Sequence, residues 1–146
     1  MQRGHTLFEL LVVLAVAAII AAVSIPSVAW VEGRAAVAAD ARSLALVMRH
    51  AQARASSSGD PVVVRLQNDG HGYLCEWGAG TDLTILDSGR FHGACATNYP
   101  GGAVEFPVWG WPCTLAGEPR AGTFSFTCEG ASASVVLQMG GRIRWQ

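Results

Sequence analysis

Four cysteines are the first side chains in this sequence that could do chemistry. Cys75, Cys95, Cys113 and Cys128 allow three disulfide pairings. The local pairing Cys75–Cys95 and Cys113–Cys128 would close loops of about fifteen to twenty residues, and the entropic account gives each roughly 3 kcal/mol of stabilisation. We predict this local pairing.

Two of these cysteines also lie near histidines at spacings that could serve zinc. The segments His71-x-x-x-Cys75 and His92-x-x-Cys95 could together supply two histidine and two cysteine ligands. All four cysteines follow a long apolar run, however, which suits export to an oxidising compartment where disulfides are the usual state. We therefore predict no metal site and no cofactor.

A pair of arginines near the carboxyl terminus could bind phosphates. On a strand, Arg142 and Arg144 would face one side, and Ile143 and Trp145 the other. The two guanidinium groups would start about 6.6 Å apart, a spacing that could straddle successive phosphates of a DNA strand. The same strand could instead simply complete a sheet, with its arginines solvated or paired with carboxylates.

Nothing else in the sequence suggests catalysis. The chain has no G-x-S-x-G, no H-E-x-x-H and no phosphate loop, and it contains no lysine. The net charge of −1 gives no overall nucleic-acid signature. Trp109 and Trp111 could form a contact surface, but we expect them to pack on the core or within their loop. We interpret the chain as a structural and interaction protein that is not an enzyme.

The amino terminus contains the strongest structural pattern. No charged residue occurs from Leu10 to Val31, so this stretch can form a helix long enough to cross a bilayer of roughly 30 Å. Arg3 precedes the run, and Glu32 and Arg34 follow it. A positive leader favours a cytoplasmic amino terminus and export of the rest of the chain.

Glu9 is unusual at the start of this apolar helix. A carboxylate in a membrane helix costs about 2.5–3.5 kcal/mol and usually marks a function that involves a partner. Cleavage after Gly4 would leave the helix attached and create a free amine at His5, which is a natural counter-ion for Glu9 in the same chain or in a neighbour. The alternative is an ordinary signal anchor in which Glu9 occurs by chance.

Residues 4–10, G-H-T-L-F-E-L, resemble the class III signal of type IV pilins and type II secretion pseudopilins. The resemblance implies that a prepilin peptidase cuts between Gly4 and His5 and methylates the new amino terminus. It also implies that Glu9 pairs with the amine of an adjacent subunit during filament assembly. Pro26 stands where pilin helices commonly have a proline, whereas His5 replaces the usual phenylalanine.

The rest of the chain predicts a helix followed by strands. An apolar stripe suggests that the helix continues and packs on a sheet, with turn formers at 56–61 ending it; the stripe consists of Val37, Ala41, Leu44, Met48, Ala51 and Ala55. Strand patterns follow at 61–66, 72–77, 83–86, 103–106, 122–128, 134–138 and 142–145. The poor periodicity of residues 89–122 predicts long loops.

We predict an α+β fold in which a long amino-terminal transmembrane and amphipathic helix packs on a small, mostly antiparallel sheet domain, as in pilins. The predicted organisation is a leader at 1–4, a transmembrane, filament-core helix at 5–31, its amphipathic continuation at 32–55 and a β-rich domain at 56–146. The order of helix, valine strand, T-F-x-F-x-C strand and G-R-I-R hairpin resembles the H-type pseudopilin and FimT branch of minor pilins.

This resemblance implies a function in filament assembly. The protein would sit in the bacterial inner membrane by a single span, with its carboxyl-terminal domain in the periplasm, until it joins a type II secretion pseudopilus or a type IV pilus. It would prime or cap that filament, with other pilin subunits, the prepilin peptidase and the inner-membrane assembly platform as partners. FimT members of naturally competent bacteria bind DNA through a G-R-x-R tail, so DNA is a second implied partner, at Arg142 and Arg144.

Overall fold

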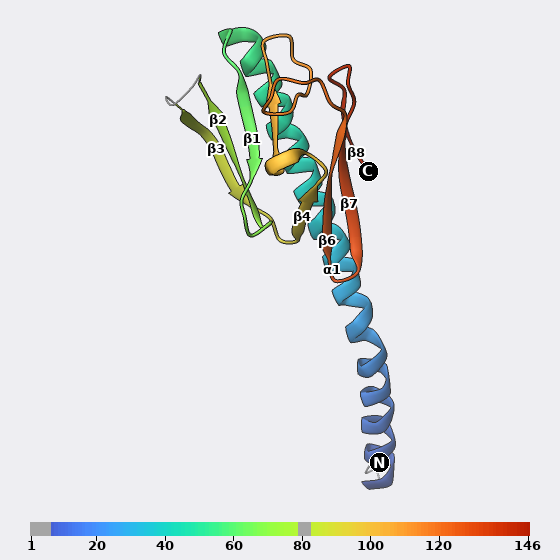
Figure 1. Ribbon diagram of the computed structural model, residues 1–146. Coiled ribbons are helices and arrows are strands. Elements are labelled where there is room, and N and C mark those ends of the chain that lie inside the picture. The colour runs from blue at the N-terminus through green and yellow to red at the C-terminus, as the bar shows by residue number, and fades with distance from the viewer. Residues whose placement is uncertain (1–6, 79–82) are drawn as a thin grey trace.

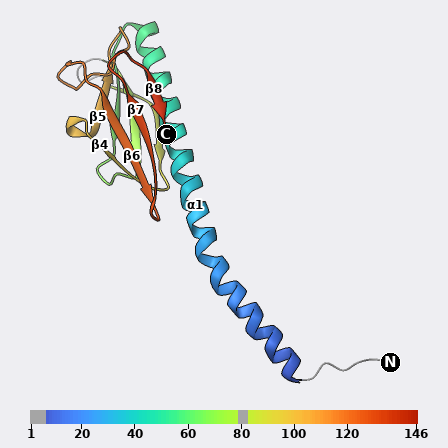
Figure 2. The same ribbon diagram turned by 90° about the vertical axis from the view of Figure 1, so that its right-hand side faces the viewer.

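One helix accounts for more than a third of the chain. The computed structural model describes residues 7–78 and 83–146, without the side chains of residues 23–29. The helix α1 runs unbroken from Leu7 to Ser58, and its amino-terminal half projects from the rest of the molecule as a stalk (Figures 1 and 2). Its 52 residues correspond to a length of about 78 Å.

The carboxyl end of α1 lies where the turn formers predict it. Gly59 follows Ser58 with a left-handed φ of 81°, which a residue with a side chain adopts only at a cost. The hydroxyls of Ser57 and Ser58 donate hydrogen bonds to the carbonyl of Arg54, so one carbonyl of the last turn has side-chain partners. Pro61 then prevents the helix from continuing.

Within the described residues, no helical segment is both long enough and apolar enough to cross a membrane. The predicted transmembrane helix 5–31 falls partly on residues that the structure does not describe, and it stays a prediction. Gly4 and His5 lie outside the described residues, and so does the side chain of Pro26.

The described strands form two four-stranded antiparallel sheets beside α1. The first has the order β3-β2-β1-β5, and the second has the order β4-β6-β7-β8. A short 3-10 helix, η1 (Pro100–Gly102), precedes β5. The strands are β1 (Val62–Leu66), β2 (Gly72–Trp77), β3 (Thr84–Arg90), β4 (Ala94–Thr97), β5 (Ala103–Phe106), β6 (Gly122–Cys128), β7 (Ala131–Leu137) and β8 (Ile143–Trp145).

The predicted fold class is confirmed, and most strands lie where the sequence indicates. The strands β2, β5 and β6 have the predicted bounds. By contrast, β3 continues to Arg90 because it pairs with β2 up to that residue, apart from a bulge at Leu86, and β7 begins at Ala131 because it pairs with all of β6. The prediction of long loops between residues 89 and 122, apart from the strand at 103–106, is wrong at β4, whose four residues pair with β6.

The core lies between α1 and the two sheets. The predicted stripe from Val37 to Ala55 is fully buried, and it packs with Phe106, Phe124 and Phe126, which are also fully buried. Phe91 joins the two sheets, because its ring stacks on Tyr73 of the first sheet and meets Phe126 of the second edge-on, with centroids 4.9 Å apart.

Gly33 marks the point where the sheet domain first touches the stalk. The turn between β6 and β7 approaches α1 so closely that a Cβ atom on Gly33 would lie 3.2 Å from the carbonyl oxygen of Cys128 and 3.3 Å from Cβ of Glu129. A glycine inside a helix normally costs about 1 kcal/mol relative to alanine. Here it permits close packing between the helix and the turn.

Candidate functional site

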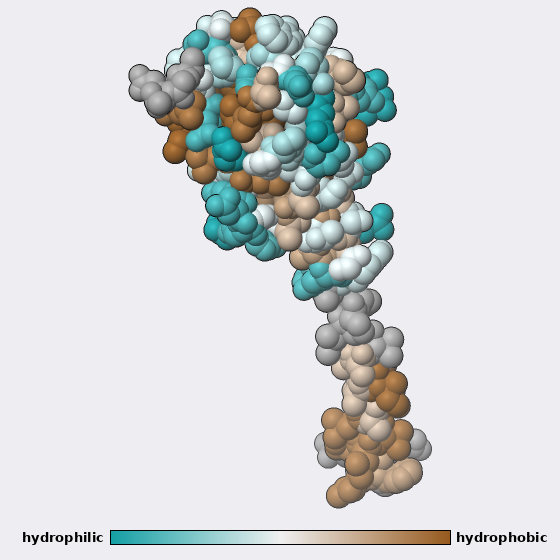
Figure 3. Space-filling model, in the orientation of Figure 1, coloured by the Kyte–Doolittle hydropathy of each residue, from teal (hydrophilic) through white to brown (hydrophobic). Residues whose placement is uncertain are grey.

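The amino-terminal half of α1 is an exposed apolar surface. Its large side chains from Leu7 to Ile20 are open to solvent, with Leu7 at 81% exposure. Figure 3 shows this apolar stalk below a domain of mixed polarity. A water-exposed surface of this kind is normally covered by lipid or by other protein. Alanines between the large residues would let a second helix approach closely; they are Ala15, Ala17, Ala18, Ala21 and Ala22.

Glu9 lies in the first turn of α1, where the helix dipole favours a negative charge. Its side chain is exposed in the single chain. The predicted cleavage site, Gly4–His5, lies outside the described residues. The amine that cleavage would create is therefore not part of this geometry, and the pairing of Glu9 with a neighbour's amine stays a prediction.

The carboxyl-terminal arginines lie on the hairpin of β7 and β8. Gly141, with a φ of 79°, forms the turn, and the hairpin closes with a 2.9 Å hydrogen bond from the Gln138 nitrogen to the Arg142 carbonyl. Ile143 is buried against the core, and Arg49 of α1 donates a 3.1 Å hydrogen bond to its carbonyl oxygen. β8 is thus attached to the helix as well as to β7.

Arg142 and Arg144 are both exposed, as the alternation of the strand predicts. Arg144 pairs with Val136 across the hairpin, and its neighbour Trp145 lies under the guanidinium of Arg42, 4.3 Å from the ring centroid. In the part of the chain that the structure describes, neither Arg142 nor Arg144 uses its side chain in an ion pair or a hydrogen bond. The alternative of arginines paired with carboxylates therefore finds no support there.

The tryptophans of the loop after β5 are exposed, so the expectation that they pack on the core is wrong, although the indole of Trp109 keeps a hydrogen bond to the side chain of Cys113 within the loop. Trp109 is 63% exposed and Trp111 is 48% exposed. Their loop is tied at its base, because Glu105 and Cys113 exchange backbone hydrogen bonds of 3.0 and 2.8 Å. With the loop ends fixed in this way, both indoles stay exposed while Pro112, which follows them in the sequence, is fully buried.

Gln52 of α1 connects this loop to the carboxyl-terminal hairpin. Its amide nitrogen donates hydrogen bonds to the carbonyl of Gly110, at 2.6 Å, and to the carbonyl of Gly141, at 3.0 Å. This residue was not predicted from the sequence. Gln52 lies four residues after Met48 and three before Ala55, so a polar side chain beside the buried stripe is the signal that could have found it.

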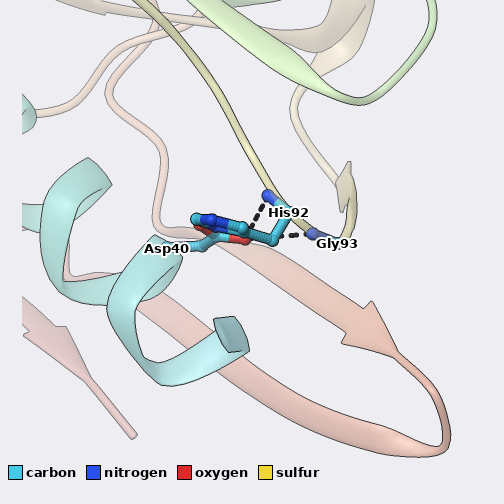
Figure 4. Close-up of polar contacts among 3 residues, drawn as sticks. All are labelled: Asp40, His92 and Gly93. Atoms are coloured by element: carbon cyan, nitrogen blue, oxygen red, sulfur yellow. Dashed lines mark hydrogen bonds and ion pairs between the residues drawn. The ribbon is translucent and has the colours of Figure 1, made fainter. Parts of the chain in front are cut away.

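Asp40 is a second missed residue, and it connects α1 to the segment between the two sheets. Its carboxylate accepts hydrogen bonds from the backbone nitrogens of His92, at 2.8 Å, and Gly93, at 3.0 Å (Figure 4). The imidazole Nδ1 of His92 lies 2.9 Å from the other carboxylate oxygen. Asp40 is only 4% exposed. A carboxylate between Val37 and Leu44 on an apolar stripe requires such partners.

The four cysteines are free thiols, and neither predicted disulfide is formed. Cys75 lies in β2 of the first sheet and Cys95 in β4 of the second, so closeness in sequence does not bring them together. Cys113 pairs with Glu105 at the loop base, while Cys128 ends β6 beside the turn to β7. Burial raises the pKa of the Cys75 thiol to about 11 and that of Cys95 to about 12. Among the described residues, no group of three or more potential ligands could hold a metal ion.

Comparisons with known proteins find a motif at the amino terminus and solved structures with a similar fold. The family described as "Prokaryotic N-terminal methylation motif" matches residues 1–25. A search of curated proteins finds no match. The crystal structure of the type IV minor pilin FimU of Pseudomonas aeruginosa PAO1 is similar, with a TM-score of 0.62 and 15% identity over 75% of this chain and 87% of that one. The minor pseudopilin EpsH of the Vibrio cholerae type 2 secretion system has a TM-score of 0.60 and 14% identity, over 75% of this chain and 94% of that one.

Proposed function

We propose that this chain, which is pilin-like in its methylation motif and its fold, is a minor subunit of a type IV pilus or a type II secretion pseudopilus. The observation that carries the proposal is the exposed apolar half of α1, which lies within the residues that the motif matches. The chain would act by assembly and not as an enzyme, like the filament subunits whose fold it shares.

The motif indicates an anchored precursor in the inner membrane. In this proposal the leader is residues 1–4, residues 5–31 form the membrane and filament-core helix, residues 32–55 continue it, and residues 56–146 form the periplasmic domain. The prepilin peptidase would cut between Gly4 and His5 and methylate His5. The helix would then move from lipid into the filament, where it packs against helices of other subunits, while the domain primes or caps the filament with the help of the assembly platform.

Glu9 would drive the correct register of this packing. A carboxylate surrounded by apolar helices costs about 2.5–3.5 kcal/mol unless a cation meets it. The free amine of a neighbouring subunit would supply that cation at one axial position only. Pro26 lies farther along the same helix and removes one backbone donor, which would allow the helix to bend inside a filament.

The test compares Glu9→Gln with Glu32→Gln, a matched control at an exposed acidic residue of the same helix beyond the apolar run. We expect Glu9→Gln to reduce incorporation into sheared filaments at least tenfold and Glu32→Gln to leave it unchanged. Mass spectrometry of the mature protein should give a methylated amino terminus at His5. Normal incorporation of the Glu9→Gln protein, or an intact Met1, would count against the proposal.

DNA binding by Arg142 and Arg144 is a second candidate function. The supporting observation is that two exposed arginines lie two residues apart on one hairpin, with no acidic partner in the described part of the chain. Each phosphate contact contributes to a binding constant that falls as salt is added. A low-salt gel shift should lose most binding in Arg142→Ala and Arg144→Ala. The control Arg90→Ala removes the same charge from β3, where Arg90 pairs with Asp69 at 3.2 Å, and should bind normally; equal binding by all four proteins would exclude this function.

A further inference from the structure

We propose that Trp109, Trp111 and the adjacent arginines form a platform for single-stranded DNA, with bases stacked on the indole rings and phosphates on the guanidinium groups. This inference rests on the second candidate function and specifies its ligand. We call the exposed side chains of Trp109, Trp111, Arg142 and Arg144 the stacking surface.

The tryptophan loop and the arginine hairpin lie against each other. A Cβ atom on Gly141 would lie 3.0 Å from the carbonyl oxygen of Gly110 and 3.7 Å from Cδ1 of Trp111. Arg142 is the next residue in the chain. Trp111 and Arg142 are therefore near neighbours in the folded chain, although they are 31 positions apart in the sequence.

The backbone that carries the stacking surface is held in place before any ligand binds. The tryptophan loop is closed at its base by the two hydrogen bonds between Glu105 and Cys113. At its tip, the carbonyl of Gly110 shares the amide of Gln52 with the carbonyl of Gly141. Because the loop and the hairpin use the same helical residue, little backbone entropy remains to be lost on binding.

The charge of the stacking surface suits an anion. Neither arginine has an acidic partner among the described residues. Glu118 is the only acidic residue in the stretch 107–121, and Arg120 balances it two positions later. A positive charge beside exposed aromatic rings is the combination that single-stranded nucleic acids use, because every base offers a flat face to an indole.

Double-stranded DNA would make less use of these groups. Its bases are stacked on one another and present only their edges in the grooves, so a duplex could contact the arginines through phosphates but could not place bases on Trp109 or Trp111. A separated strand can use both. Single-stranded DNA should therefore bind more tightly than a duplex of the same length.

The experiment measures fluorescence anisotropy of a labelled oligo(dT) and of a labelled duplex of equal length, with the full chain in non-ionic detergent. Trp109→Ala and Trp111→Ala should each weaken binding of the single strand about tenfold and change duplex binding less than twofold. Trp111→Phe, which keeps an aromatic face, should recover most of the affinity. Ile85→Ala, at an equally exposed apolar residue of β3, is the matched control and should bind normally.

The outcomes separate this inference from the functions on which it builds. If the arginine variants lose binding while both tryptophan variants bind like the control, the stacking surface is refuted and DNA binding by the hairpin stands. Equal affinity for the single strand and the duplex would also refute the stacking surface and leave DNA binding by the hairpin standing. If the wild type binds neither DNA, both the DNA function and this inference fail, and the filament function remains to be judged by the Glu9 test.

Discussion

Replacing Asp40 with alanine should be strongly destabilising, and the structure gives the size of the effect. The carboxylate accepts two hydrogen bonds from backbone nitrogens of the segment between β3 and β4, and the bond from Gly93 is buried. Hydrogen bonds to a charged group contribute about 1.5–3 kcal/mol each, and a buried donor left without a partner costs about 1–3 kcal/mol. We expect a loss of about 3 kcal/mol, since water can reach the nitrogen of His92 more easily than that of Gly93.

His92→Ala is the matched control, because it removes the imidazole and keeps both backbone nitrogens. The His92 side chain is 73% exposed, and ion pairs at such positions contribute less than about 1 kcal/mol. The two variants therefore separate the backbone hydrogen bonds from the side-chain pair. Asp40→Asn should fall between them, because its amide oxygen can still accept one of the two bonds.

Thermal unfolding of the full chain in detergent at neutral pH, followed by near-ultraviolet circular dichroism, measures these differences. For a domain of about a hundred residues, 3 kcal/mol corresponds to a lower Tm by roughly 12–24 °C, and the control should change Tm by less than about 8 °C. Two results would refute the reasoning: an Asp40→Ala protein within 1 kcal/mol of wild type, or a His92→Ala protein that loses as much as Asp40→Ala.

Three further outcomes follow from packing and burial. Gly122→Ala should destabilise the domain by about 1–3 kcal/mol, because the new Cβ would collide with the buried ring of Tyr99. The control Gly140→Ala, with open space around it, should be neutral. Equal Tm values for the two variants would show that the ring moves aside freely. At pH 8 the Cys75 and Cys95 thiols should resist iodoacetamide until the chain is unfolded. Burial raises their pKa values to about 11 and 12, which leaves at most about one thiolate in a thousand. Rapid labelling of the native protein would contradict this. The same pKa shifts predict that the fold loses stability at alkaline pH. The folded pKa values exceed the ordinary value of 9.0, so the contribution of the thiols to stability is complete below pH 9 and is lost as pH rises toward 11 and 12. A denaturation midpoint that does not change over that pH range would exclude this loss of stability.

The elements with a local signal were predictable from the sequence. The stripe from Val37 to Ala55 repeats at helical spacing, and Phe124 and Phe126 alternate with polar residues, so burial follows directly from the period. β4 has no such signal. Its sequence, Ala-Cys-Ala-Thr, is short and weakly apolar, and it becomes a strand because β6, which starts 25 residues after the end of β4, supplies its hydrogen-bond partners.

In the candidate sites, too, the features with a local sequence signal were predictable and the contacts between distant residues were not. Exposure of Arg142 and Arg144 follows from alternation along a strand, which the G-R-I-R-W sequence displays. The connection between the tryptophan loop and the hairpin does not, because it passes through Gln52, which is 58 residues from Gly110 and 89 from Gly141. The predicted Cys75–Cys95 pairing fails for a related reason, because these two residues, near in sequence, lie in different sheets.

The absence of a side chain at Gly33 has a mechanical consequence. On the amino-terminal side of Gly33 the described part of α1 has no support from the sheets, and on the carboxyl-terminal side the same helix packs in the hydrophobic core (Figure 2). A pull or twist applied to the helix next to Gly33 would therefore pass directly into the domain, and the β6–β7 turn would bear part of that load. A bulkier residue at this position would push the β6–β7 turn away from the helix and change the angle between the helix and the domain.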